Sequence, residues 1–188
     1  MALTGILLAA GRGKRFDPSG VQNKLLQALE SGDAVVAASA RNMLAALPRV
    51  LAVVRPGDDK VAALLGALGC EVRVCVDADL GMAESLATAI DCTKGAEGWV
   101  IALGDMPHVQ PETIRALAAT IEQGAHIAAP VYEGRRGNPV AFSSYHLPLL
   151  LALEGDQGAR AILKTHAVSE LVVDDVGVVR DIDTPGDL

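Results

Sequence analysis

A glycine-rich segment near the start of the chain combines a flexible backbone with positive charge. Residues 9–15 read Ala-Ala-Gly-Arg-Gly-Lys-Arg, and Lys24 follows Arg15 nine positions later. Backbone N–H groups in a glycine-rich turn can approach an anion, and lysine and arginine neutralise its charge. The dinucleotide-binding fingerprint does not fit, because Phe16 stands where it needs glycine, and a P-loop Gly-Lys-Ser/Thr is absent. The segment predicts binding of a phosphate-bearing ligand, with a solvated basic loop as the alternative.

Two acidic segments offer ligands for a metal ion. Asp105 belongs to residues 104–107 (Gly-Asp-Met-Pro), directly after an apolar run, and Asp181 and Asp183 lie close to the last residue. Mg²⁺ prefers carboxylate and phosphate oxygens, so Asp105 is a candidate ligand, with a second from Asp181 or Asp183. The alternatives are an Asx-type turn at Asp105 and, favoured for Asp181, an N-cap of a final helix that begins at Pro185.

The other polar residues give weaker signals. Ser85 stands at an expected helix start, where serine is more often a cap than a nucleophile. Residues 77–79 (Asp-Ala-Asp) have the spacing of a glycosyltransferase metal motif, but a motif this short arises easily by chance. No Cys-x-x-Cys pair, histidine ligand spacing or Gly-x-Ser-x-Gly elbow is present, so the sequence gives no sign of covalent catalysis.

Alternating apolar strands and amphipathic helices must position these segments. Strands are expected at 3–9, 50–54, 71–76, 99–103, 126–130, 138–142, 170–173 and 178–180. Helices are expected at 34–47 (with Asp33 as N-cap), 58–68 (closed by Gly69), 82–92, 111–123, 146–153 and 159–164. This order is typical of a mostly parallel sheet with helices on both faces, and we expect the 138–142 strand to run against the others. Because ligands bind at the carboxyl ends of such strands, the sites to expect follow residues 9, 54, 76 and 103.

Composition excludes several classes of protein. The 188 residues fit a single domain spanning 1–188, and a hydrophobic content of 51% excludes a disordered chain. A formal charge of −7 argues against a nucleic-acid partner or an anionic membrane. No apolar stretch approaches the ~20 residues of a membrane span, and no signal peptide is recognisable. Three cysteines without a pairing pattern indicate a reducing compartment, so we expect a cytoplasmic location.

Taken in order, the motifs resemble those of a known family. They are residues 8–15 with Lys24, then 80–82 (Leu-Gly-Met), 104–107, 137–139 (Gly-Asn-Pro), 155–160 and 181–185. This set resembles the molybdopterin nucleotidyltransferases, which have a MobA-like NTP transferase domain, over nearly the whole chain. Leu-Ala-Ala-Gly at 8–11 is more similar to the molybdenum cofactor cytidylyltransferases than to the guanylyltransferases, which typically read Leu-Ala-Gly-Gly. The resemblance implies a three-layer, mostly parallel α/β fold of the Rossmann-like nucleotide-diphospho-sugar transferase kind.

The resemblance also implies roles for individual residues. Arg15, Lys24 and Asp105 would be catalytic, and Asp105 and Asp183 would hold Mg²⁺. The nucleotide CTP would be bound by Leu8, Ala9, Ala10, Gly11, Arg12, Gly13, Lys24, Asp77, Gly81, Ser85 and Gly104. The acceptor would be bound by Asn138, Asp156 and Arg160.

The reaction implied is transfer of CMP from CTP to the phosphate of molybdopterin with release of pyrophosphate, and a molybdenum hydroxylase could receive the product. Two departures from the family pattern keep alternatives open. Glu84 stands shortly after the Gly-Met of residues 81–82, at a place where the family commonly has serine. The spacing between Arg15 and Lys24 is longer than the family's usual arginine–lysine spacing. GTP could replace CTP, and a sugar or alcohol phosphate could be the acceptor. A non-catalytic nucleotide-binding chaperone is the rival from another class, but a pure binder has no need of a metal site.

Overall fold

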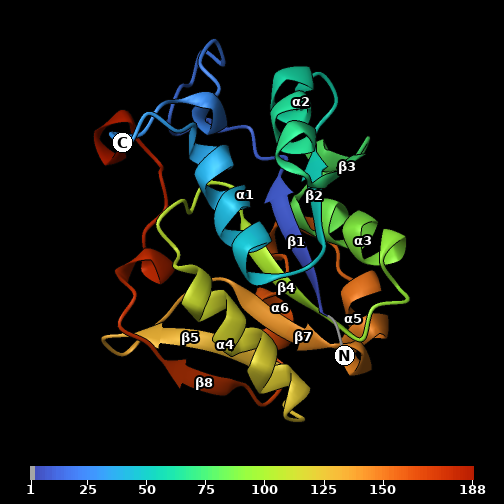
Figure 1. The fold of residues 1–188 in the computed structure, drawn as a ribbon. Helices are drawn as coiled ribbons and strands as arrows, with labels where there is room; N and C mark the ends of the chain where they lie inside the picture. Colours follow the sequence, from blue (N-terminus) through green and yellow to red (C-terminus); the bar gives the residue numbers. More distant parts are fainter. Residues whose placement is uncertain (1–2) are drawn as a thin grey trace.

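Apolar runs rich in valine, isoleucine, leucine and alanine form the strands of one mixed sheet at the centre of the molecule (Figure 1). The structure is a computed structural model that describes residues 3–188. Its strands are β1 (Thr4–Ala9), β2 (Val50–Val54), β3 (Glu71–Val74), β4 (Gly98–Leu103), β5 (Ile127–Tyr132), β6 (Arg135–Arg136), β7 (Val140–Ser143) and β8 (Ser169–Val172). Among these described residues the order is β3-β2-β1-β4-β7-β5-β6, with β8 paired to β5. As predicted, most pairs are parallel, and β7 runs antiparallel to β4 and β5.

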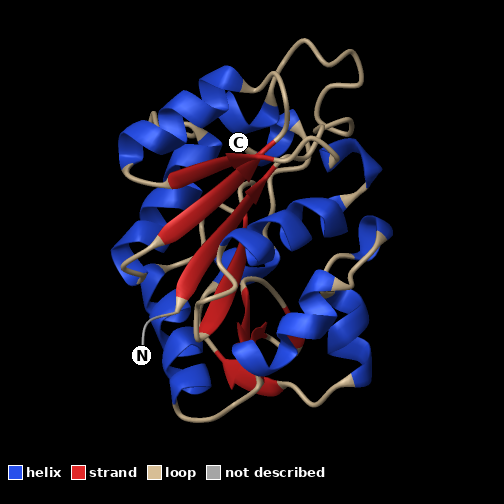
Figure 2. Ribbon diagram, turned by 90° about the vertical axis from the view of Figure 1, so that its right-hand side faces the viewer, coloured by secondary structure: helices blue, strands red, loops and turns tan. Residues whose placement is uncertain are grey.

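Helices cover both faces of this sheet (Figure 2). The helices are α1 (Val35–Ala46), α2 (Asp59–Leu68), α3 (Met82–Cys92), α4 (Pro111–Glu122), α5 (Leu147–Leu151) and α6 (Arg160–Thr165). Buried residues of α1, α2 and α4 form one core cluster, and those of α3, α5 and α6 form another. The expected three-layer α/β arrangement is therefore confirmed. Among residues 3–188, none of the helices is long and apolar enough to cross a membrane.

The central strand β1 contributes to both cores. Leu7 and Ala9 pack with the α1 side, while Ile6 and Leu8 pack with the α3 side. Successive side chains of a strand point to opposite faces, so a strand covered on both faces must be apolar at every position. This is why residues 5–9 are a continuous apolar run in the sequence rather than an alternating one.

The order of the strands creates a crevice beside β1. The chain proceeds from β1 to β2 and β3 on one side, and then returns to place β4 on the other side of β1. At such a switch point the loops after the two central strands diverge, leaving room for a ligand at the carboxyl ends. The loops that begin after Ala9 and Leu103 lie on either side of this point.

Two predicted features near the C-terminus are wrong. Residues 178–180 do not form a strand; Val176–Val179 is a 3₁₀-helix, because the Asp175 carboxylate accepts a hydrogen bond from the Gly177 N–H and turns the chain. Asp181 does not cap the last helix, whose N-cap is Thr184. The Asp181 side chain is therefore left for other contacts.

The predicted cap of α1 is also wrong. The N-cap is Ala34, which makes no side-chain capping bond. The Asp33 carboxylate instead forms an ion pair with Arg41, in the second turn of the helix. The predicted closure of α2 by Gly69 is confirmed, since that glycine adopts a left-handed conformation with φ of 105°.

Three histidines gather at the opposite end of the sheet, before β5, after β7 and after α6. His146 is 3% exposed, and its ring lies 5.1 Å from that of His166 and 6.2 Å from that of His126, with Tyr145 packed against it. Its buried Nδ1 has no hydrogen-bond partner in the described structure. Burial lowers the pKa of His146, and the neighbouring His166 and His126 lower it further.

We expect this histidine to make stability depend on pH. With a folded-state pKa below its ordinary value of about 6.5, the unfolded chain binds more protons in acid, so stability falls as the pH drops below that value. Thermal unfolding between pH 7.5 and 5.5 should show a steeper loss for the native chain than for His146→Phe. Equal slopes would mean that the buried ring does not contribute to the acid sensitivity.

Candidate active site

A cleft of about 550 Å³ opens at the carboxyl ends of β1 and β4. The glycine-rich loop after β1 forms one wall, and the loop that leads from β3 into α3 forms another. The predicted nucleotide-binding residues that line it are Leu8, Ala9, Ala10, Gly11, Arg12, Gly13, Lys24, Gly81 and Ser85. The predicted catalytic and metal-binding residues that line it are Arg15, Lys24, Asp105 and Asp183. Segments far apart in the sequence thus meet in one cavity.

Four predicted site residues lie outside the set that lines the cleft. Asp77 is exposed at the end of the third strand, and Gly104 is buried against Ala9 and the Leu8 carbonyl. Of the predicted acceptor residues only Asp156 lines the cleft, whereas Arg160 is exposed elsewhere and Asn138 lines a small void behind the Asp105 loop.

Three carboxylates converge beside the cleft. Asp105, Asp181 and Asp183 each offer an oxygen, and these atoms lie within 4.8 Å of one another. The sequence favours Asp181 as a helix cap, but side chains two residues apart in an extended segment point to the same side. Asp181 and Asp183 therefore both face Asp105, while Ile182 between them is buried. The repeated acids around an apolar residue were the signal for this cluster.

The charges of this acidic cluster are only partly balanced. Burial raises the pKa of Asp181, and the nearby Asp183 and Asp105 carboxylates raise it further, outweighing the opposite effect of Lys24. Asp105 Oδ1 is buried and has no hydrogen-bond partner among the described residues. Buried polar atoms are nearly always satisfied, so an orphaned carboxylate oxygen in an acidic cluster is consistent with a cation site. A set of carboxylates fits a hard divalent ion such as Mg²⁺ or Mn²⁺.

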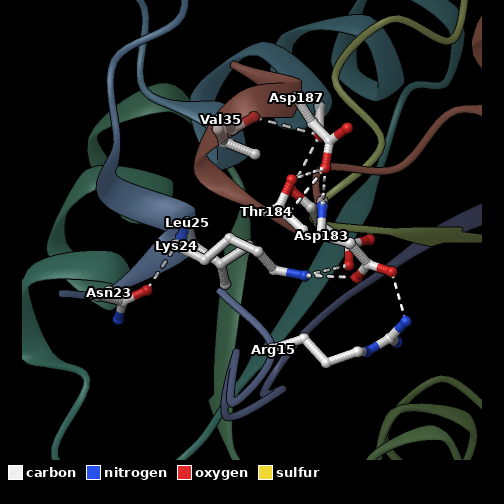
Figure 3. Close-up of polar contacts among 11 residues, drawn as sticks. Arg15, Asn23, Lys24, Leu25, Val35, Asp183, Thr184 and Asp187 are labelled. Atoms are coloured by element: carbon white, nitrogen blue, oxygen red, sulfur yellow. Dashed lines mark hydrogen bonds and ion pairs between the residues drawn. The ribbon is translucent and has the colours of Figure 1, made fainter. Parts of the chain in front are cut away.

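Two cations approach the cluster from the N-terminal loop (Figure 3). Lys24 Nζ lies 2.8 Å from Asp105 Oδ2 and 3.6 Å from Asp183 Oδ1, and its side chain is 11% exposed. Arg15 reaches the other oxygen of Asp183 from the opposite side and is largely exposed. Lys24 is therefore a fixed component of the site, whereas the guanidinium of Arg15 is accessible to a ligand.

The long spacing between Arg15 and Lys24 folds into a turn of its own. Phe16 is buried and anchors the start, and the Asp17 carboxylate accepts hydrogen bonds from the N–H groups of Ser19 and Gln22. The 3₁₀-helix Lys24–Leu26 follows, capped by the Asn23 side chain. The extra residues project outward, so Lys24 still reaches the carboxylates.

Asp79 closes one side of the cleft with two arginines. Its Oδ1 accepts a hydrogen bond of 2.8 Å from Arg12 Nε and another of 2.8 Å from Arg55. The hydrogen bond from Arg12 is the main cause of a lowered pKa of Asp79. From the sequence, Asp77, and not Asp79, is predicted to bind the nucleotide. Of these two aspartates, Asp79 is the one that lines the cleft. The contact joins the glycine-rich loop to the segment before α3.

Gly81 lets the 155–157 segment reach the same cleft. Its φ is 147°, and a Cβ on it would lie 2.5 Å from the Gly155 carbonyl oxygen and 2.9 Å from Asp156 Oδ1. A side chain there would therefore collide with neighbouring backbone. The predicted motifs around Gly81 and Asp156 are therefore in direct contact at this wall of the cleft.

A family model described as a MobA-like NTP transferase domain matches residues 5–171. The purine catabolism protein PucB of Bacillus subtilis (strain 168) is 30% identical over 196 residues, which cover 97% of this chain and 92% of PucB.

Solved structures of other proteins have the same fold as this chain. Rv0371c from Mycobacterium tuberculosis H37Rv superimposes with a TM-score of 0.85 at 29% identity, covering 100% of this chain and 95% of that one. Its complex with manganese gives a TM-score of 0.78 at 27% identity, covering 100% and 96%. CMP:2-keto-3-deoxy-manno-octonic acid synthetase complexed with CTP shares the fold alone, with a TM-score of 0.74 at 13% identity over 98% of this chain and 95% of that one.

Proposed function

This chain belongs to the family of MobA-like NTP transferase domains, and from that premise we propose that it transfers CMP from CTP to the phosphate of a molybdopterin-type acceptor. The family and the fold support a transferase. We propose further that residues 1–188 act as one catalytic domain in the cytoplasm, and that a molybdenum hydroxylase receives the product.

The observation that carries this proposal is the meeting of Lys24, Asp105 and Asp183 beside the glycine-rich loop. In the proposed reaction an oxygen of the acceptor phosphate attacks the α-phosphorus of CTP. The bond from this phosphorus to the oxygen that bridges it to the β-phosphate breaks, and pyrophosphate leaves with that oxygen. Such a transfer needs positioning and charge neutralisation rather than covalent catalysis by the protein.

The residues of the cleft match these needs. Backbone N–H groups of residues 11–13 and the exposed guanidinium of Arg15 would bind the triphosphate. Lys24, held between two carboxylates, would stabilise the charge that grows on the transferred group and on pyrophosphate. Asp156, at the far wall of the cleft, would contact the acceptor.

We propose Mg²⁺ as the cofactor, held by Asp105 and Asp183 with Asp181 as a third carboxylate. A divalent cation bound there supplies Lewis-acid stabilisation of phosphate oxygens. The orphaned Oδ1 of Asp105 supports this assignment, as does the manganese complex of Rv0371c, at 27% identity.

The choice of CTP rests on Leu-Ala-Ala-Gly at residues 8–11, all of which line the cleft. Glu84 was one of two reasons for considering another acceptor, but it does not belong to the residues that line the cleft. Its charge therefore gives no argument against an anionic acceptor.

Pyrophosphate release tests the proposal. The purified protein is incubated with Mg²⁺ and either CTP or GTP, each with and without molybdopterin. Release with CTP that requires molybdopterin is the expected result. Release with GTP would change the nucleotide, and release only with a sugar or alcohol phosphate would change the acceptor. Nucleotide binding without release under any of these conditions would favour a binding module and overturn the catalytic reading.

A further inference from the structure

Helix α1 presents two polar side chains to the loop that carries Asp105. Ser39 and Asn42 are three positions apart, so they lie on the same face of the helix. The hydroxyl-bearing Ser39 is only 4% exposed and stands among valine, alanine and methionine residues that form the core. Neither residue lines the main cleft, so neither is explained by contact with a substrate.

Both side chains donate hydrogen bonds to main-chain carbonyls of the 104–107 loop. Ser39 Oγ lies 3.0 Å from the Gly104 carbonyl oxygen, and Asn42 Nδ2 lies 2.9 Å from that of Pro107. Ser39 Oγ also lies 3.2 Å from the carbonyl oxygen of Val35 in its own helix, so its single proton is shared between helix and loop.

The same loop is held from its other side by the C-terminal segment. The Ile182 N–H donates to the carbonyl of Asp105 itself over 2.9 Å. The carbonyls of residues 104, 105 and 107 are thus each fixed by a donor at least 65 positions away in the sequence. A void of only about 10 Å³ separates the loop from α1, at the lower limit for one water molecule.

We propose that Ser39 and Asn42 are positioning residues that set the affinity of the acidic cluster for a divalent cation, an inference that rests on the proposed function. The Asp105 side chain has one oxygen on Lys24 and one buried oxygen without a partner. Where that free oxygen points depends on the backbone of the 104–107 loop. Groups that orient a metal ligand commonly change metal affinity when they are removed, although they never touch the ion.

Direct titration with Mn²⁺, followed by the electron paramagnetic resonance of the free ion, tests this inference without relying on turnover. Ser39→Ala and Asn42→Ala should each weaken Mn²⁺ binding by roughly 10-fold. In the activity assay they should raise the metal concentration that gives half-maximal rate, and leave the rate at saturating metal close to that of the native chain.

Thr120→Val is the matched control. Within residues 3–188 the Thr120 hydroxyl donates only to the Ala116 carbonyl of its own helix α4, over 2.8 Å. The variant removes this hydroxyl while keeping the volume of the side chain. It should leave Mn²⁺ binding unchanged. Asp105→Asn is the reference for loss of the ion, and should bind Mn²⁺ more weakly than either α1 variant.

The outcomes separate this inference from the function on which it rests. If the native chain binds Mn²⁺ and Asp105→Asn does not, but both α1 variants bind like the native chain, the positioning role is wrong and the metal site stands. If the native chain binds no Mn²⁺, both are wrong. Should Ser39→Ala fail to fold, the half-buried Asn42→Ala carries the same comparison on its own.

Discussion

Asp105→Asn should lower the rate of pyrophosphate release by at least 10²–10³-fold, the range seen when one preorganised charge contact is removed from an active site. Asparagine keeps the shape of the side chain but replaces one oxygen by an amide and removes the negative charge. The partner of Lys24 Nζ and the buried, unpartnered Oδ1 both belong to this carboxylate, so the substitution affects the cation site and the orientation of Lys24 together.

The measurement is steady-state release of pyrophosphate at saturating nucleotide over a range of Mg²⁺ concentrations. Asp91→Asn is the matched control, because that carboxylate lies on the exposed surface of α3 and pairs only with Lys94 in the described structure. It should stay within about 2-fold of the native rate, since exposed pairs contribute little. Near-native turnover by Asp105→Asn would remove Asp105 from the proposed chemistry.

Lys24→Met should lower turnover by a similar factor of about 10²–10³, for a different reason. Methionine keeps much of the apolar stem and removes the ammonium group that lies between Asp105 and Asp183. The charge that develops on the transferred phosphate and on pyrophosphate then loses its nearest fixed cation. The three carboxylates also lose a competitor for an added ion, so binding of Mn²⁺ should be as tight as in the native chain or tighter.

Measuring turnover and Mn²⁺ binding on the same samples distinguishes the two variants. Asp105→Asn loses both, whereas Lys24→Met loses turnover and keeps the ion. Lys94→Met, at an exposed position near the end of α3, controls for loss of a lysine charge and should leave both unchanged. If Lys24→Met turns over like the native chain, Lys24 is not the catalytic lysine that the resemblance to the family implies. Arg15, which also contacts Asp183, is then the next residue to test.

The sequence alone predicted the layers of this fold and the place of its cleft. Continuous apolar runs, as in residues 5–9, predict strands covered on both faces, and the alternation with helices predicts a parallel sheet with a crevice at its carboxyl edge. These are local patterns of hydrophobicity and capping. Most of the predicted helices and strands therefore agree with the structure to within one or two residues.

The local sequence pattern did not predict the conformation of segments that are held by residues far away in the sequence. Residues 178–180 have the composition of a strand, but they turn because Asp175 binds the Gly177 N–H and the Val178 carbonyl accepts from Asn138. Asp181 also meets a distant partner: its carboxylate joins the acidic cluster with Asp105, whereas Thr184 caps the last helix.

The candidate site divides in the same way. Residue types and spacing pointed to the glycine-rich loop and to Asp105, the resemblance to the family pointed to Lys24 and Asp183, and all of these line the cleft. Their distances, the orphaned oxygen of Asp105 and the hydrogen bonds from Ser39 depend on side chains 65 or more positions apart. Only the packed sheet and its helices bring such residues together, since no property of the local chain encodes a contact at that separation.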